Sequence, residues 1–229
     1  DYFKTKSNSP VIAVDNTYMG PLWCQPLTLG ADLVIYSATK YIGGHSDLIG
    51  GVLITNNKSI SEELYFIQKS AGAVPSPFDC WMLLRSTKTM GLRVQKQSDN
   101  AMELAKRLEP IIGVDSIIYP GLENHPQHQL AKQQQLSPLG DPIYGSIISI
   151  KLGTVKARDK FLSKIQLFTL AESLGGVESL VCIPYGMTHG SVPNEIKTDM
   201  GLTEDLIRLS VGIEHIEDLY NDIIQAIEK

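Results

Sequence analysis

A turn that is rich in hydroxyl groups and contains a lysine follows an apolar run early in the chain. Ser37, Thr39 and Lys40 come directly after the run at residues 32–36. Hydroxyls and backbone N–H groups at the end of a strand can hold a phosphate, and the lysine amine reaches into the same space. A desolvated, neutral amine forms a Schiff base with an aldehyde. The pattern therefore indicates either such a site or a solvated surface lysine.

An aspartate ends the preceding apolar run. Asp15 follows residues 11–14, and a carboxylate there is costly unless it has a partner. It either forms the turn of the Asp-Asn-Thr segment or pairs with a protonated ring nitrogen such as that of pyridoxal phosphate. Asp15 and Lys40 end two successive strands, so both are expected at the carboxyl edge of one parallel sheet.

Three short strands and one helix are predicted in the first part of the chain. The runs at 11–14, 32–36 and 51–54 are apolar on both faces, which is typical of buried parallel strands. Ser59 and Glu62 have capping-box spacing, which predicts a helix through about Lys69.

A long helical region and a second α/β pattern follow. Residues 73–77 contain two prolines and are predicted to be non-helical. From residue 78 to 109 a long helix is expected, with a break near 87–91 and an end at Pro110. A polar loop is expected at 122–142. Beyond residue 110, strands are expected at 116–119, 146–152 and 206–211, and helices at 154–165 and from Ile216 to Ile227.

Seven separated segments together resemble the Cys/Met-metabolism pyridoxal-phosphate enzymes, and within them the cystathionine γ-lyases. The longest is DLVIYSATKYIGGHS, which is similar to the lysine signature of that family. The others, in chain order, are AVDNTYMGP, GAVPSPFDCW, YPGLENHPQH, FTLAESLGGVESL, MTHG and LIRLSVGIE.

The resemblance implies a role for each residue of the turn and of the preceding aspartate segment. Lys40 would carry pyridoxal 5'-phosphate and move protons during catalysis. Asp15 would bind the pyridinium nitrogen, and Thr17 would lie beside the ring. Ser37 and Thr39 would contact the phosphate.

The resemblance also implies substrate-binding residues in the second half. Arg208 would bind the α-carboxylate of an amino-acid substrate through its planar guanidinium. Ser173 would position Lys40 and that carboxylate, and Glu172 would face the distal end of the substrate. From their positions alone, Arg208 reads as a charge on an edge strand and Glu172 as an acidic loop residue.

The implied fold is α/β, of the aspartate-aminotransferase type (fold-type I). Residues 1–110 would form the back part of the cofactor domain, including the long linking helix, and residues 111–229 a smaller C-terminal α/β domain. The glycine-containing phosphate loop that family members carry upstream has no counterpart here. The same is true of an aromatic residue that stacks on the cofactor and of a Tyr and an Arg that reach a neighbouring subunit.

The implied activity is that of a carbon–sulfur lyase that converts L-cystathionine to cysteine, 2-oxobutanoate and ammonia in transsulfuration. Cystathionine γ-synthase, β-lyase and methionine γ-lyase activities of the same family stay open, as does an inactive fragment that lacks the phosphate loop. The resemblance further implies a cytoplasmic homotetramer with sites shared between subunits.

Composition excludes several other classes of protein. The net charge is −5, so a broad nucleic-acid surface is not expected. No apolar stretch is long enough to span a membrane, and the first ten residues contain no signal or transit pattern. Cys24, Cys80 and Cys182 are interpreted as free, partly buried thiols in a reducing compartment. His125 and His128 lack further ligands for a metal and are expected in a solvated loop.

Overall fold

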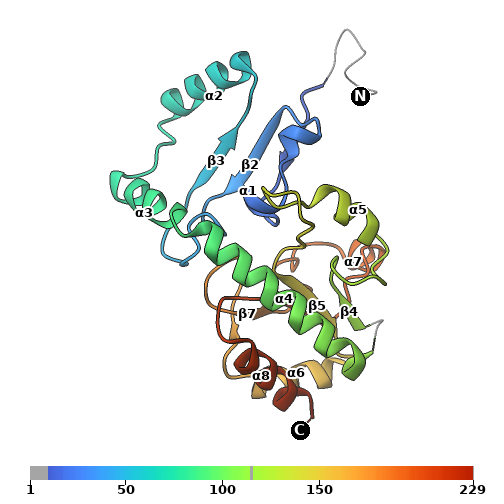
Figure 1. Cartoon of the computed structure of the whole chain (residues 1–229). Helices are drawn as coiled ribbons and strands as arrows, with labels where there is room; N and C mark the ends of the chain where they lie inside the picture. Colours follow the sequence, from blue (N-terminus) through green and yellow to red (C-terminus); the bar gives the residue numbers. More distant parts are fainter. Residues whose placement is uncertain (1–9, 114–115, 229) are drawn as a thin grey trace.

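Two β-sheets joined by a long helix make up the part of the chain that the structure describes. The computed structural model describes residues 10–113 and 116–228. The helix α4 (Met90–Ile112) runs obliquely between the two parts, with the first sheet above it and the second beneath it in Figure 1. The predicted boundary between residues 110 and 111 falls near the end of α4 and stays a prediction.

The first sheet has the order β1-β2-β3. Its strands are β1 (Ala13–Asp15), β2 (Leu33–Ser37) and β3 (Gly51–Ile54), as the apolar runs predicted. β1 and β2 are parallel, so Asp15 and Ser37 end at the same edge. The prediction of three buried parallel strands is wrong for the direction of β3, which pairs antiparallel with β2. It is also wrong for the burial of β1 and β3, neither of which contains a buried residue. An apolar run indicates a strand but does not encode the direction in which it pairs.

The helices of the first part start and end differently from the predictions. In α2 (Lys58–Ala71) the N-cap is Asn57, whose side chain accepts hydrogen bonds from Ser59 N and Ile60 N, so the capping box at Ser59 is wrong. In α3 (Pro77–Thr87) Pro77 occupies the first turn, where its missing N–H costs nothing. The short helices α1 (Gly20–Trp23) and η1 (Pro26–Leu29) were not predicted.

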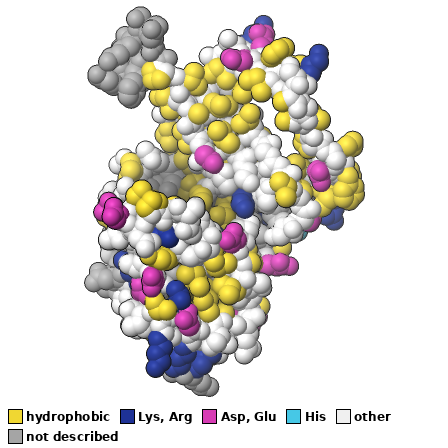
Figure 2. Space-filling view, turned by 180° about the vertical axis from the view of Figure 1, so that it is seen from behind, with side chains coloured by type: hydrophobic (Ala, Val, Ile, Leu, Met, Phe, Trp, Pro, Cys, Tyr) yellow, Lys and Arg dark blue, Asp and Glu magenta, His cyan; other side chains and the backbone are white. Residues whose placement is uncertain are grey.

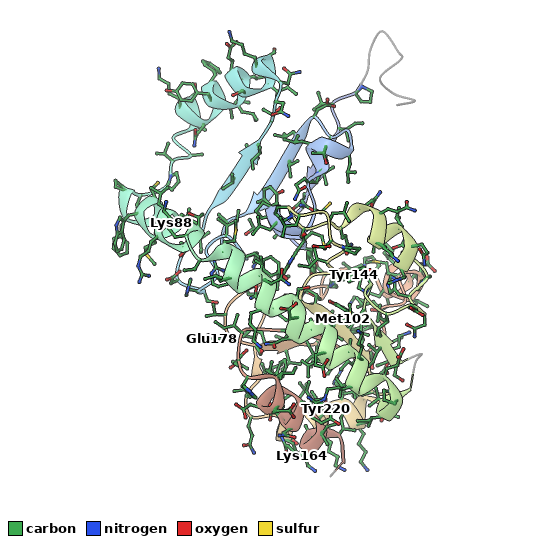
Figure 3. The ribbon with its side chains drawn as sticks, viewed as in Figure 1. Lys88, Met102, Tyr144, Lys164, Glu178 and Tyr220 are labelled. Atoms are coloured by element: carbon green, nitrogen blue, oxygen red, sulfur yellow. The ribbon has the colours of Figure 1, made fainter. Side chains whose placement is uncertain are left out.

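The break between α3 and α4 lies at residues 88–89, as predicted. Lys88 marks it in Figure 3. The predicted end at Pro110 is wrong, because α4 continues to Ile112 and ends at Gly113, whose N–H donates to Glu109 O. A proline in the last turn removes one hydrogen bond without interrupting the turns before it.

The second sheet has the order β4-β5-β8-β7-β6. The predicted strands are β4 (Ile117–Ile118), β5 (Ile147–Lys151) and β8 (Leu206–Ser210). The predicted helices are α6 (Val155–Lys164) and α8 (Ile216–Glu228). Three further elements were not predicted, because they are too short to show periodicity: β6 (Thr169–Leu170), β7 (Leu180–Cys182) and α7 (Asn194–Asp199).

The predicted polar loop at 122–142 contains a helix, α5 (His128–Gln134). His128 is buried: its ring stacks on Tyr144 and its Nδ1 lies 2.8 Å from Pro120 O. The expectation of a solvated histidine is therefore wrong at this position. Among the described residues, no group of three His, Cys, Asp or Glu side chains could hold a metal.

Two hydrophobic clusters support the fold. The larger one lies between α4, the second sheet, α6 and α8, and Met102 and Tyr144, which are labelled in Figure 3, pack against it. The smaller one consists of Trp23, Tyr41, Val94, Ile143 and Leu174. Because Tyr41 follows Lys40 and Leu174 follows Ser173, this smaller cluster lies directly under the predicted site residues.

The exterior of the first part is unusually apolar. Figure 2 shows hydrophobic side chains gathered over the first sheet and along α2 and α3, which stand away from it. A cleft of about 920 Å³ separates β3 from α2. No helix among residues 10–113 and 116–228 is both long and apolar enough to cross a membrane. Large exposed side chains on the two helices are Tyr65, Phe66, Ile67, Phe78, Trp81 and Leu84.

Candidate active site

Lys40 lies in the turn after β2, where the alternative interpretation placed a solvated surface charge. Its Nζ donates a hydrogen bond to Ser173 Oγ over 3.0 Å, and the side chain is partly buried. Burial lowers the pKa of the Lys40 amine, and the nearby Arg208 cation lowers it further. Both effects favour the neutral, nucleophilic amine.

Ser173 adopts an unusual backbone conformation. Its φ is +103°, a value that residues other than glycine rarely adopt. The hydroxyl meets Lys40, while the carbonyl accepts a hydrogen bond of 2.9 Å from an Arg208 terminal nitrogen. Ser173 thus connects the lysine of the first part with the arginine of the second.

Arg208 lies in the middle of the second sheet. β8 has a neighbouring strand on each side, and Arg208 is 8 % exposed, so the interpretation of an edge-strand charge is wrong. One terminal nitrogen donates to Tyr18 Oη over 2.7 Å and the other to Ser173 O. The Nε is buried and has no hydrogen-bond partner among the described residues. A buried guanidinium with an unused donor suits an incoming carboxylate.

The ends of β1 and β2 are joined through Thr17. Its Oγ1 accepts a hydrogen bond of 2.8 Å from Ser37 N, and its own N–H donates to Asp15 Oδ1. Asp15 is exposed, and its carboxylate accepts the Thr17 N–H, so it forms the turn of the Asp-Asn-Thr segment that was the alternative to a cofactor contact. The structure therefore brings Asp15, Thr17 and Ser37 together, and a role of Asp15 toward a ring nitrogen stays a prediction.

The two hydroxyl residues before Lys40 differ in their contacts. Thr39 Oγ1 accepts a hydrogen bond of 3.1 Å from Gly50 N, which ties the turn to the start of β3. The Ser37 hydroxyl has no hydrogen bond to any residue that the structure describes, so it is available to a phosphate oxygen.

Glu172 is exposed, next to Ser173 in sequence, and close enough to Cys182 to raise the pKa of that thiol. Burial is the larger cause of that rise.

All three cysteines are free, as expected, but Cys80 is exposed rather than partly buried. Tyr18, whose hydroxyl accepts a hydrogen bond from Arg208, was not predicted as a site residue. The signal for Tyr18 was its place in the same segment as Asp15 and Thr17.

These residues fit pyridoxal phosphate on the evidence of the structure itself. A desolvated lysine amine suits its aldehyde, and the unpaired Arg208 Nε suits the carboxylate of an amino acid held beside it. The Ser37 hydroxyl lies three residues before the lysine, where a phosphate would be expected.

Comparison with known proteins agrees with this fit. Residues 3–228 match the family model described as Cys/Met metabolism PLP-dependent enzyme. The chain is 48 % identical over 223 residues to a cystathionine γ-lyase of Bacillus subtilis, covering 97 % of this chain and 57 % of the relative. It is 46 % identical over 224 residues to a cystathionine β-lyase of Lactococcus lactis, covering 98 % and 57 %.

Solved structures are similar as well. The yeast cystathionine γ-lyase superposes with a TM-score of 0.91 at 45 % identity, covering 97 % of this chain and 56 % of that one. A cystathionine γ-synthase from Xanthomonas oryzae gives a TM-score of 0.88 at 38 % identity, covering 94 % and 54 %. The chain thus spans slightly more than half the length of these relatives, and the expected fold-type I architecture is confirmed. It belongs to the family of Cys/Met metabolism PLP-dependent enzymes.

Proposed function

We propose that this chain is the lysine-bearing part of a carbon–sulfur lyase that converts L-cystathionine to cysteine, 2-oxobutanoate and ammonia. The observation that carries the proposal is the hydrogen-bonded series from Lys40 through Ser173 to Arg208. It places an amine whose pKa is lowered by burial and by Arg208 beside a buried cation, which is what an amino-acid substrate and an aldehyde cofactor require together. The similarity to cystathionine γ-lyases supports the choice of substrate.

Each side chain has a distinct task in this proposal. Pyridoxal phosphate, when bound, would withdraw electrons from the substrate Cα. Lys40 would bind the cofactor aldehyde and then carry protons from the substrate Cα and Cβ, so that the thiol at Cγ can leave. Arg208 would orient the substrate by its carboxylate, and Ser173 would hold the Lys40 amine on the reacting side.

Asp15, Thr17, Ser37, Thr39 and Glu172 complete the proposed site. Asp15 would keep the ring nitrogen protonated and Thr17 would lie against the ring. Ser37 and Thr39 would donate to the phosphate. Glu172 would face the distal end of the substrate, where its exposed position leaves room for a long side chain.

The decisive experiment is a product assay on a protein of the relatives' full length that contains this chain. With L-cystathionine as substrate, we expect cysteine and 2-oxobutanoate. Homocysteine and pyruvate would instead identify a β-lyase, an outcome that the similarity to the Lactococcus enzyme makes worth testing. Supplying an activated homoserine with cysteine tests for the γ-synthase reaction, as the similarity to the Xanthomonas enzyme suggests.

A separate measurement tests the alternative of an inactive fragment. Pyridoxal phosphate is added to this chain alone, and its absorbance is compared between the native sequence and Lys40→Ala. An absorbance change that requires Lys40 would show that the chain binds the cofactor by itself. No change would favour a fragment that needs the remainder of the protein.

The proposed assembly is a cytoplasmic homotetramer whose sites are completed by neighbouring subunits. The exposed apolar side chains of α2 and α3 support a contact with further polypeptide on this face. Light scattering of the full-length protein tests the assembly, and a stable, active monomer would contradict it.

A further inference from the structure

The first half of α4 has polar side chains on its buried face. Arg93, Gln97 and Asn100 are spaced by four and three residues, so they lie on one side of the helix. They are 5 %, 0 % and 2 % exposed. Farther along, the same helix buries apolar side chains against the second sheet. Buried polar side chains are normally hydrogen-bonded, so the partners of these three residues show why this half of the face is polar.

Arg93 holds the segment directly after Lys40. Its guanidinium donates to Tyr41 O over 2.9 Å and to Ile42 O over 3.3 Å. The guanidinium also lies so close to Gly44 that a Cβ at that position would overlap it. The backbone that follows Lys40 is therefore fixed directly on α4.

Gln97 holds the segment after Ser173. Its Nε2 donates to Gly176 O over 2.6 Å and to Gly175 O over 3.3 Å. Gly175 in turn packs on the Tyr41 backbone, where an added Cβ would lie 2.9 Å from Tyr41 N. In Figure 3, Glu178 of this segment lies alongside α4.

Asn100 holds the segment after Arg208. Its Nδ2 donates to Gly212 O over 3.0 Å and to Glu214 O over 2.9 Å. The three segments also bond to each other: Val177 N donates to Gly44 O, and Ile213 N donates to Val177 O, each over 2.9 Å. One helix face thus supports a connected layer of backbone just beyond Lys40, Ser173 and Arg208.

We propose that Arg93, Gln97 and Asn100 are positioning residues that set the relative placement of Lys40, Ser173 and Arg208. This inference rests on the proposed function, since it assigns these three residues, the polar stripe of α4, a part in that reaction. The three site residues come from segments far apart in sequence, and side chains of α4 donate hydrogen bonds to all three of the segments that follow them. Displacing one segment by about 1 Å can cost up to about 100-fold in rate when it carries a reacting group.

The test uses Gln97→Met in the full-length protein, with Gln95→Met as matched control. Gln95 is the same residue type on the same helix, but it is exposed, and its side-chain amide donates to Asp99 on the helix surface. We expect Gln97→Met to lower kcat about tenfold or more. In the cofactor-free protein we expect the pKa of Lys40, measured by competitive acetylation and mass spectrometry, to rise, because the amine becomes more hydrated and Arg208 moves away. Gln95→Met should change neither.

Asn100→Ala is the second variant. Should Gln97→Met fail to fold, Asn100→Ala becomes the deciding test of the proposal. It releases the segment after Arg208, so it should raise KM more than it lowers kcat. A merely structural role predicts a lower melting temperature with unchanged kcat, KM and Lys40 pKa, and that result would overturn the proposal. If the wild type does not cleave cystathionine, the proposed function fails, while the Lys40 titration still tests the placement of that residue by α4.

Discussion

The Lys40 amine donates a hydrogen bond to the Ser173 hydroxyl, across 133 residues of sequence. The serine makes this contact from a backbone with φ of +103°, a conformation that costs about 1–3 kcal/mol for a residue with a side chain. Glycine would adopt it without strain but has no hydroxyl. The strain therefore persists at a position where a side-chain oxygen meets the proposed catalytic lysine.

A pair of substitutions separates the strain from the hydroxyl. Ser173→Gly and Ser173→Ala both remove the contact with Lys40, but only glycine relieves the backbone. We expect Ser173→Gly to be more stable than Ser173→Ala by about 1 kcal/mol, since the entropy of glycine in the unfolded chain offsets part of the relief. Urea unfolding of the full-length protein measures the difference. Both variants should lose activity, and a fully active Ser173→Ala would contradict the role of the hydroxyl.

The pKa of Lys40 leads to a pH dependence of cofactor uptake. Burial and the Arg208 cation lower this pKa, and only the neutral amine attacks an aldehyde. The rate at which cofactor-free protein takes up pyridoxal phosphate should therefore rise with pH and level off earlier than for an exposed lysine. Arg208→Gln removes the cation, raises the pKa of Lys40 and moves the curve to higher pH. Stopped-flow absorbance measures the curve; an unmoved curve would contradict the coupling.

The main elements of the fold and the composition of the site could be predicted from the sequence. The apolar runs before Asp15 and Lys40 gave both strand ends, and the parallel pairing of β1 with β2 brings them to one edge as expected. The long helical pattern gave α3, α4 and the break between them. These features are local, so periodicity and turn residues suffice to predict them.

Features that depend on distant segments could not be predicted. The direction of β3 and the burial of Arg208 in a central strand depend on which strands pair. The residues of one strand alone do not determine its neighbours. The polar stripe of α4 was visible as Arg93, Gln97 and Asn100 at helical spacing. Without the segments that accept their hydrogen bonds, however, such residues are indistinguishable from a solvated helix face.

Two glycines with nearly equal backbones test the packing of Arg93. Gly44 and Gly72 have φ of +71° and +68°, but an added Cβ meets nothing within 4 Å at Gly72 and overlaps Arg93 at Gly44. Gly72→Ala should cost about 1–2 kcal/mol for its conformation. Gly44→Ala should cost about 1–3 kcal/mol more, because the guanidinium must move. Urea unfolding compares them, and equal losses would contradict the close approach.

Arg208→Lys tests the proposed binding of the substrate carboxylate. The arginine bonds to Tyr18 Oη and Ser173 O and retains a buried, unpaired Nε, whereas a lysine offers one nitrogen without the planar fork. We expect kcat/KM to fall by the equivalent of roughly 2–3 kcal/mol, because a charged hydrogen-bonding group is misplaced. The absorbance of bound pyridoxal phosphate should be retained, since Arg208 is not assigned to its phosphate or ring nitrogen.

The matched control is Arg107→Lys, which alters an arginine whose ion pair with Glu217 lies at the surface. Exposed pairs contribute little, so this variant should keep the wild-type kcat/KM. Steady-state kinetics of the two variants, each in the full-length protein, gives the comparison. If Arg208→Lys were as active as Arg107→Lys, the buried guanidinium would serve only structural bonds, among them those to Tyr18 and Ser173, and the substrate carboxylate would have to bind elsewhere.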